Sequence, residues 1–583
     1  PLSENEYLGH IERLGKKNKV FKSYIGMGYN QSIVPSVIKR NILENPSWYT
    51  AYTPYQAEIA QGRMEALLNY QTIISDLTGM ELANASLLDE STAAAEAMTM
   101  LFSLRTRDQK KNNVNKFLVS SNTLPQTISL LETRAEPLGI EIVFGDLNKF
   151  EFDDKFYGCI IQYPGLYGEI IDIKKYCLKA VNNNVKIIVA ADLLSLCLLK
   201  KPSCFDADVV VGTSQRFGIP LGYGGPHAAY FATKEEYKRS VPGRIIGLTK
   251  DVDEDPALRM ALQTREQHIK RDRATSNICT SQVLLAVMAG MYGVYHGPKG
   301  LKEIAGSIHL KALLLEKNLE KIGVQQLNKY FFDTIRLKVS SKKIKKIAII
   351  NKLNFNYINE NEISISVNEA TSLKDIQIIV DVIAKSLNAD LFEIETKFNL
   401  SRIPENLNRS SDFMSLEIFN KYHSETALMR YIKNLERKDL SLTHSMISLG
   451  SCTMKLNAAS EMIPISWSKW NNIHPFAPLD QAIGYQKLLK KLEKQLNEIT
   501  GFSGTSLQPN SGAQGEYAGL MVIREYLKST SNEHRNICLI PSSAHGTNPA
   551  SAVMAGMKVV VVGTDKHGNI NVDELKEKAE HYK

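Results

Sequence analysis

The chain is 583 residues long, which is more than a single hydrophobic core usually fills, so several domains are expected. Its composition, 43% hydrophobic and 23% charged, is typical of a soluble globular enzyme, and no apolar run approaches the ~18 residues of a membrane helix. The formal net charge of +8 is modest because 70 basic residues are scattered among 62 acidic ones. The sequence therefore argues against a membrane protein and against a nucleic-acid-binding protein.

The cysteines and the first residues indicate the compartment. Seven cysteines show neither CxxC pairs nor a metal-type spacing with histidine, as expected in a reducing compartment, and no metal site is predicted. The chain starts at Pro1 with no apolar signal segment, although an upstream segment can be missing. We expect a cytoplasmic protein, or a mitochondrial matrix protein if the source is eukaryotic. A redox enzyme built on Cys279 or Cys452 is disfavoured, since neither has a visible base or resolving cysteine.

Short apolar runs alternate with helical segments in the first half of the chain. The runs are 117–120, 140–144, 159–162, 185–190, 209–211 and 228–231. Strands rich in Val and Ile and separated by helical crossovers predict an α/β layer with a mainly parallel sheet flanked by helices. Beyond it the spacing predicts a helical region, a smaller α+β domain and a charged connector, at 281–322, 330–390 and 398–440.

The most informative feature is an internal repeat with an offset of 422 residues. The matched pairs are Gly28 and Gly450, Trp48 and Trp470, Gly62 and Gly484, Thr78-Gly79 and Thr500-Gly501, and Ser120-Ser121 and Ser542-Ser543. Between these anchors a shift of two residues aligns Ser91 with Ser511. Chance matching is the alternative, but the chain has only three tryptophans, so a matched pair of them favours a true repeat.

The repeat divides the chain into a full first unit and the opening of a second. We expect a large domain at 1–300, a smaller α+β domain with a connector at 301–440, and the start of the second unit at 441–583. Residues 558–562 read as a strand and 572–582 as a crossover helix, and a parallel βαβ unit needs a further strand. We therefore expect the second unit to be truncated at its C-terminal side.

A candidate phosphate site lies in residues 507–519, LQPNSGAQGEYAG. A turn there leads into a helix whose first N–H groups lack intrahelical partners and lie at the positive end of the helix dipole. Gly512 and Ala513 permit close approach of a ligand to the backbone, and Ser511 and Gln514 offer side-chain donors. An ordinary N-capped helix is the alternative interpretation.

A candidate ring-stacking residue follows the next expected strand. In the run ICLIPSSAHGTNPAS the strand leads into a turn with His545, Thr547 and Asn548. A turn after one strand can place an aromatic ring over a cofactor whose phosphate lies at the end of another strand. A surface or capping histidine is the alternative.

In the first unit, Asp192 ends a buried-looking strand, and the next strand ends near Gln215 and Arg216. In enzymes that bind a pyridine cofactor, a carboxylate at the end of the first of these strands can pair with the ring nitrogen. A lysine at the end of the next strand forms the covalent link to the cofactor. Because Gln215 and Arg216 stand where the lysine is needed, the first unit is not expected to make that link.

Several long motifs now identify a family. They are YIGMGY at 24–29, PSWYTAYTPYQ at 46–56, SLLDE at 86–90, SQRFGIPLGYGGP at 214–226, Arg265 to His268, TSNIC at 275–279, GSCTMKL at 450–456 and SAHGTNP at 543–549. Together they resemble the P-protein of the glycine cleavage system along nearly the whole chain, the segments near 330–435 excepted.

The resemblance implies two tandem units of the fold-type I PLP (pyridoxal 5'-phosphate) enzymes, of which the second binds the cofactor and the first is a degenerate copy. It places PLP on Ser511 to Gln514, His545, Thr547 and Asn548. It suggests Met454, Lys455 and His474 as residues that line the glycine site. Gln215 then corresponds to the Schiff-base lysine, and the offset moves that lysine and its aspartate partner to about positions 637 and 614, beyond Lys583. No catalytic residue is therefore expected in this chain.

The resemblance also implies a function. The P-protein decarboxylates glycine with PLP, releases CO2 and passes the aminomethyl group to the lipoyl group of the H-protein, alongside the other proteins of the system. We expect a homodimer when the protein is intact, and no activity from this chain alone. Single-unit PLP enzymes such as aminotransferases and cysteine desulfurases lack the tandem copy. A non-catalytic subunit that supports an active site on a second chain is the rival from another functional class.

Overall fold

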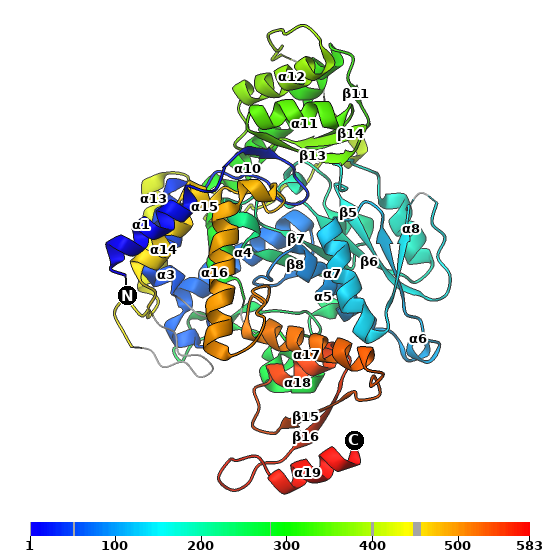
Figure 1. Ribbon diagram of the computed structural model, residues 1–583, viewed down its shortest axis with the longest axis vertical. Helices are drawn as coiled ribbons and strands as arrows, with labels where there is room; N and C mark the ends of the chain where they lie inside the picture. The colour runs from blue at the N-terminus through cyan, green and yellow to red at the C-terminus, as the bar shows by residue number, and fades with distance from the viewer. Residues whose placement is uncertain (1, 51–52, 148, 280, 398–400, 447–455) are drawn as a thin grey trace.

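The computed structural model describes residues 2–50, 53–147, 149–279, 281–397, 401–446 and 456–583 (Figure 1). Its centre is a seven-stranded sheet with the order β2-β8-β7-β6-β5-β3-β4. The strands are β2 (Leu82–Ala83), β3 (Lys116–Ser120), β4 (Glu141–Gly145), β5 (Phe156–Tyr163), β6 (Lys186–Ala191), β7 (Val209–Thr213) and β8 (Ala229–Thr233). Strands β3 to β7 are parallel, β8 runs antiparallel to β7, and β2 at the edge runs antiparallel to β8. The predicted strands and the mainly parallel sheet are confirmed.

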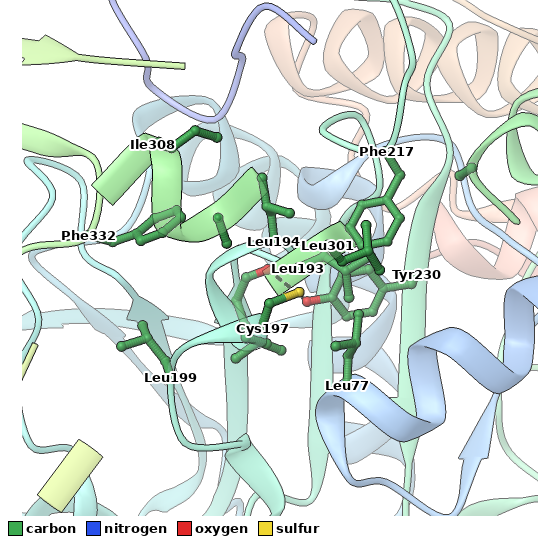
Figure 2. Close-up of a cluster of buried hydrophobic side chains, with 14 of the residues drawn as sticks. Leu77, Leu193, Leu194, Cys197, Leu199, Phe217, Tyr230, Leu301, Ile308 and Phe332 are labelled. Atoms are coloured by element: carbon green, nitrogen blue, oxygen red, sulfur yellow. Dashed lines mark hydrogen bonds between the residues drawn. The ribbon is translucent and has the colours of Figure 1, made fainter. Parts of the chain in front are cut away.

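Both faces of this sheet are covered by helices, as a parallel sheet of continuous apolar strands requires. One face packs on α5 (Glu90–Ser103) and α7 (Pro125–Ala135). The other packs on α4 (Gln61–Thr78), α8 (Lys174–Asn182) and α10 (Val283–Glu320). Figure 2 shows this second core, where Leu77, Leu301 and Phe217 lie beside Tyr230. The Tyr230 hydroxyl lies inside this core and donates to the Ala191 carbonyl at 2.7 Å, so burying it leaves no polar atom unpaired.

The smaller α+β domain is also confirmed, and lies at one end of the molecule in Figure 1. Its sheet has the order β1-β13-β14-β12-β11. The elements are β1 (Lys22–Tyr24), β11 (Gln325–Gln326), β12 (Thr334–Lys338), β13 (Leu353–Asn359), β14 (Glu362–Ser366), α11 (Ser341–Ile350) and α12 (Leu373–Leu387). Strand β1 comes from the start of the chain, so this domain includes a segment outside the expected range 301–440.

The remaining elements of the first unit are short, with one exception. They are α2 (Ser36–Ile38), α3 (Pro46–Tyr49), α6 (Arg107–Lys111), α9 (Gln267–Lys270), and the hairpin of β9 (Ile246–Lys250) and β10 (Pro256–Met260). The exception is α13 (Glu425–Arg437), which lies in the segment that the sequence showed only as a charged connector. Its apolar side, Leu428, Ile432 and Leu435, is buried. None of the helices in the described ranges combines the length and apolar character that a bilayer crossing requires.

The second unit repeats the first in its element boundaries. Its elements are α14 (Ala459–Met462), α15 (Ser468–Asn471), α16 (Ile483–Thr500), α17 (Gly512–Ser529), α18 (Thr547–Met554), α19 (Val572–His581), and the parallel strands β15 (Ile537–Pro541) and β16 (Lys558–Val562). Helices α4 and α16 both have 18 residues and begin 422 positions apart, and each ends at a left-handed glycine, Gly79 or Gly501. Trp48 and Trp470 are both buried. The repeat found in the sequence is therefore structural.

The two units exchange their leading arms. Helix α1 (Glu4–Gly15) packs against α16 of the second unit, and α13, which precedes the second unit, packs against α4 of the first. Asn18 Oδ1 accepts the N–H of Gly484 at 2.7 Å, at the start of α16. Asp439 Oδ1 accepts the N–H of Gly62 at 2.7 Å, at the start of α4. Each arm thereby satisfies N–H groups at the beginning of the other unit's helix, where a helix has no internal partners.

These helix starts admit only glycine. A Cβ at Gly484 would lie 2.4 Å from the Leu14 carbonyl oxygen, and one at Gly62 would lie 1.9 Å from the Leu435 carbonyl oxygen. Both oxygens belong to the exchanged arms, so the two glycines let the arms approach the helices closely. The repeat preserves glycine because of a contact between the units.

Replacing Gly484 by alanine should therefore loosen the exchanged arm. We expect Gly484→Ala to lower the apparent melting temperature by roughly 2–6 °C, because the added methyl group overpacks against the Leu14 carbonyl. Gly519→Ala in α17 is the matched control, since no described atom lies within 4 Å of its Cβ position. The control should be neutral or slightly stabilising, because alanine favours a helix over glycine. Equal effects of the two substitutions in thermal unfolding would contradict the account.

Candidate functional site

Helix α17 begins at the predicted phosphate site. Ser511 is its N-cap residue, and the Ser511 hydroxyl accepts the N–H of Gln514 at 3.4 Å. The first turn reads Gly-Ala-Gln-Gly, and no described atom lies within 4 Å of the Cβ position of Gly512. The N–H groups of Gly512 and Ala513 therefore start the helix beside open space, at the positive end of its dipole. The local geometry is that of an anion site.

A pocket of about 550 Å³ opens in front of this helix start. Its walls come from both units. The second unit contributes Ser506, Gln508, Pro509, Asn510, Ser511, Gln514, Tyr517, Ala518 and Met521, and the first contributes Leu87, Leu88, Asp89, Thr92, Leu130, Thr133, Arg134, Ile278, Cys279 and Gln282. Pockets of this size hold small-molecule cofactors.

His545 lies in the turn after β15 and is connected to α17 by hydrogen bonds. Its Nδ1 atom is 2.9 Å from the Thr547 hydroxyl, and that hydroxyl donates to Glu516 Oε1 at 2.9 Å. The Thr547 N–H also donates to His545 Nδ1 at 3.3 Å, so residue 547 contacts this ring nitrogen through both its hydroxyl and its backbone. Ser551 donates to the other oxygen of Glu516 at 3.2 Å. The predicted stacking residue and the predicted phosphate helix therefore belong to one network.

Residues 267–277 of the first unit hold both parts of this site. Asn277 Nδ2 donates to the Ala513 carbonyl and to the Ser551 hydroxyl, each at 3.0 Å. Arg271 Nη1 donates to the Ala544 carbonyl at 2.8 Å, in the turn that carries His545. Asn277 is fully buried, so its amide is committed to these contacts. The motifs near 265–279 were visible in the sequence, but nothing in their spacing showed that they brace the second unit.

His268 faces this turn as well. Burial lowers the pKa of His268, and the charges of Arg244 and His545 act in the same direction. Behind it, Arg244 forms a buried ion pair with Glu266. The Tyr55 ring contacts the His268 ring edge to face at 6.1 Å between centroids. The first unit thus presents a neutral imidazole, supported by a paired guanidinium, beside the candidate stacking histidine.

The remaining predicted residues are Asn548, Met454, Lys455 and His474. The structure gives Asn548 a backbone contact, from its N–H to the His545 carbonyl at 3.1 Å. Met454 and Lys455 lie outside the described residues. His474, predicted to line the glycine site, lies against the first unit, and its role at the glycine site stays a prediction. Its Nε2 atom is 3.2 Å from the carbonyl oxygens of both Gly26 and Tyr29, and burial lowers its pKa to about 4. His474 is a neutral buried donor that holds a first-unit loop.

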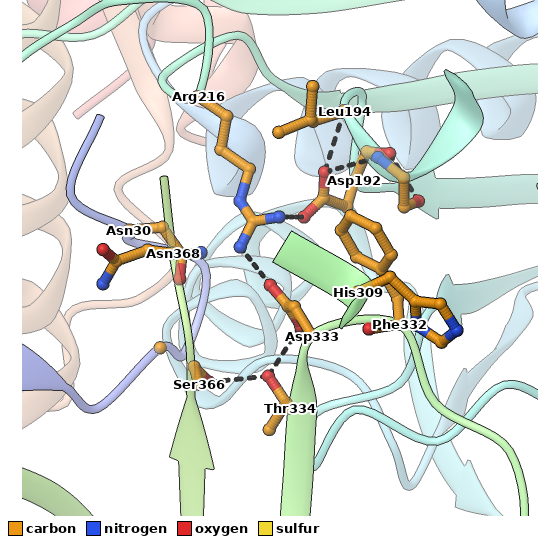
Figure 3. Close-up of polar contacts among 12 residues, drawn as sticks. Asn30, Asp192, Leu194, Arg216, His309, Phe332, Asp333, Thr334, Ser366 and Asn368 are labelled. Carbon is orange, nitrogen blue, oxygen red and sulfur yellow. Dashed lines mark hydrogen bonds and ion pairs between the residues drawn. The ribbon is translucent and has the colours of Figure 1, made fainter. Parts of the chain in front are cut away.

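The corresponding strand ends of the first unit carry an ion-pair network (Figure 3). Arg216 Nη1 lies 3.1 Å from Asp192 Oδ2, and its other terminal nitrogen pairs with Asp333. The carboxylate expected to meet a ring nitrogen therefore meets a guanidinium. Gln215 donates to the Ile219 carbonyl at 2.7 Å and accepts the Asn30 N–H at 3.0 Å.

The corresponding helix start of the first unit is acidic. Asp89 caps α5 by accepting the Thr92 N–H at 2.8 Å, and Glu90 follows it in the first turn. A carboxylate already occupies the place that a phosphate takes at a helix start, and it repels a second anion. The start of α5 is therefore unsuited to the cofactor phosphate. Asp89 also lines the pocket in front of α17, but the first turn of α17 itself carries no charged side chain.

Comparison with known proteins agrees with this arrangement. A sequence model of the family described as "Glycine cleavage system P-protein" matches residues 1–383. The chain belongs to this family. It is 64% identical over 582 residues to the "Glycine dehydrogenase (decarboxylating)" of Christiangramia forsetii and 56% identical to that of Nostoc sp., covering all of this chain in both cases. It spans 61% and 60% of these two relatives.

A solved structure gives the same result for the fold. A crystal structure titled "glycine decarboxylase (P-protein) of the glycine cleavage system, in inhibitor-bound form" matches with a TM-score of 0.62 and 30% identity. The match covers 66% of this chain and 90% of that one. The family and the tandem fold-type I architecture expected from the motifs are confirmed.

Glu90 should make stability depend on pH. Burial raises the pKa of Glu90 from 4.5 to about 7. The folded chain then keeps a proton that the unfolded chain loses, so this residue lowers stability progressively as pH rises from about 4.5 to 7, and by a constant amount above. We expect the melting temperature of Glu90→Gln, relative to the unsubstituted protein, to rise across this window. A difference that stays constant between pH 5 and pH 8 would contradict the assignment.

Proposed function

We propose that the chain is the larger part of a PLP-dependent glycine dehydrogenase (decarboxylating). In this proposal it acts on glycine, releases CO2 and passes the aminomethyl group to the lipoyl group of the H-protein, in company with the other proteins of the glycine cleavage system. The observation that carries the proposal is the open start of α17, joined to His545 through Glu516 and braced by Asn277. The name of the relative from Christiangramia forsetii, which is 64% identical to this chain, supports it.

The residues present fit PLP. The phosphate would be held by the N–H groups of Gly512 and Ala513 and by the Ser511 and Gln514 side chains, where the helix start is uncharged and uncovered. His545 would lie over the ring, with Thr547 and Asn548 beside it. When bound, PLP supplies a ring that accepts the electron pair released as CO2 leaves.

The protein's own residues position these groups. The Thr547 hydroxyl and Glu516 fix the orientation of the His545 ring, because a ring with one nitrogen hydrogen-bonded no longer turns freely. Asn277 fixes the Ala513 carbonyl, and therefore the direction of the first N–H groups of α17. The first unit supplies one wall of the pocket. Binding and orientation are what a protein contributes to a cofactor's chemistry.

The proposal includes partners and location. Glycine and the lipoylated H-protein are the proposed substrates, a homodimer the proposed assembly, and the cytoplasm, or the mitochondrial matrix in a eukaryote, the proposed compartment. Met454 and Lys455 remain predicted residues of the glycine site. The rival function, a non-catalytic subunit, gains no support, since the relatives carry this span together with further residues in one polypeptide.

PLP affinity tests the phosphate site. Gly512→Asp places a carboxylate at the start of α17, as Asp89 does in α5, and should weaken PLP binding at least ~10-fold by repelling the phosphate. Gly519→Asp is the control, since it adds the same charge to the same helix at another uncovered position. Titration of each variant with PLP, followed by absorbance, measures the effect. Equal affinities for the two variants would overturn the assignment.

Borohydride reduction tests the role of the first unit. Gln215 has no amine, and its amide is committed to Ile219 and Asn30. We therefore expect reduction in the presence of PLP to leave no stoichiometric covalent label on residues 1–440. Peptide mass spectrometry of the reduced chain detects such a label. A single fully labelled lysine in the first unit would contradict its degenerate character.

A further inference from the structure

The first unit contains a small, partly open cavity that the proposed function does not use. Its volume is about 60 Å³, and its walls include Gly26, Asn30, Gln162, Asp192 and Arg216. One water molecule needs roughly 10–15 Å³ of such space, so the cavity accommodates a molecule of a few non-hydrogen atoms. It is far too small for PLP.

The cavity is acidic. Three carboxylates line it, those of Glu90, Asp192 and Asp333, and Arg216 is the only cation among its described lining residues. Arg216 already pairs with both Asp192 and Asp333. The Asp192 side chain remains 25% exposed, although it follows the central strand β6. Its Oδ1 atom accepts the N–H groups of Leu194 and Ser195 and its Oδ2 atom faces Arg216, so only part of this carboxylate is accessible to a ligand.

The uncharged wall residues also lack donors. Gln162 is 94% buried, given its 6% exposed fraction, and its Nε2 group donates to Glu90 Oε1 at 3.1 Å. Its Oε1 atom has no hydrogen-bond partner among the described residues, and neither has Asn30 Oδ1. A buried acceptor without a donor is costly, and each such atom in a folded protein needs an explanation. Two orphaned oxygens and a partly accessible carboxylate at one small cavity match a ligand with several N–H donors and a positive charge.

We propose that this cavity binds a small primary ammonium group. A –NH3⁺ group has three donors and no acceptor, so it satisfies the oxygens of Gln162, Asn30 and Asp192 together and offsets the excess negative charge. A simple amine and the amino group of a small amino acid share this chemistry. An anion is excluded by the carboxylates, and a larger ammonium ion by the volume.

The second unit contacts the wall of this cavity. His474 holds the carbonyl oxygens of Gly26 and Tyr29, at the two sides of the lining residues Met27 and Gly28. His474 belongs to the segment that leads into α16.

Ligand-observed NMR and calorimetry with the full chain test the proposal. The probes are methylammonium, glycine, and acetate as a control of similar size and opposite charge. We expect saturable binding of methylammonium and none of acetate at this cavity. Glycine binding in competition with methylammonium would assign the site to an amino acid, and binding of methylammonium alone would assign it to a simple amine. Acetate binding as tightly as methylammonium would overturn the proposal.

Two substitutions with opposite expected effects on methylammonium affinity locate the site. Asp192→Asn should weaken methylammonium binding at least ~10-fold, and Asn30→Asp should tighten it about 3-fold or more, because it replaces an amide by a carboxylate of the same shape. Asp154→Asn, an exposed acid away from the lining residues, is the control and should leave binding unchanged. If Asp192→Asn fails to fold, Asn30→Asp still tests the proposal, because this variant is expected to bind methylammonium more tightly. Unchanged affinity in Asn30→Asp would overturn it.

Discussion

The exchange of leading arms between the two units is the constraint on which the rest of the structure depends. Asn18 closes the start of α16, and Asp439 closes the start of α4 while pairing with the buried side chain of Arg63 at 2.9 Å. Removing Asp439 would leave both helix N–H groups and a buried guanidinium without a partner, which is costly in each case. The arms therefore fix the orientation of the units. That orientation brings residues 267–277 of the first unit onto the turn and helix that form the candidate cofactor site.

The two units share a scaffold but differ in the charge at the corresponding helix starts. Helix α5 starts with Asp89 and Glu90, and Arg216 pairs with two aspartates in the same unit. Helix α17 starts with Ser511 and Gly512 beside open space. A few substitutions at helix and strand ends thus separate a unit suited to a phosphate from one suited to a small cation, while the sheet and its covering helices stay alike. Fold and site chemistry are independent here.

Much of this could be predicted from the sequence, because it depends on local patterns. The strands of the large sheet follow from their apolar runs, and the start of α17 follows from small residues after a turn. The repeat followed from Trp48 and Trp470, whose burial and spacing the structure reproduces. What the sequence did not show depends on contacts between distant segments. Helix α13 was missed although its buried residues Leu428, Ile432 and Leu435 recur at helical spacing, because charged residues dominate the segment. The contacts of His474 could not be predicted, since its partners lie more than 440 residues away.

The contacts of Asn277 with the second unit also depend on distant segments and could not be predicted from the sequence. An asparagine in a polar motif has no pattern that distinguishes a surface position from a fully buried donor to another unit. Only the assembled units show that its amide orients the first turn of α17.

A crystal structure of the chain soaked with PLP tests the central claim most directly, namely that the second unit holds the cofactor and the first unit only supports it. The account predicts phosphate density within hydrogen-bonding distance of the Gly512 and Ala513 N–H groups, with the ring beside His545. Density for PLP at the start of α5, with Arg216 displaced from Asp192, would contradict it.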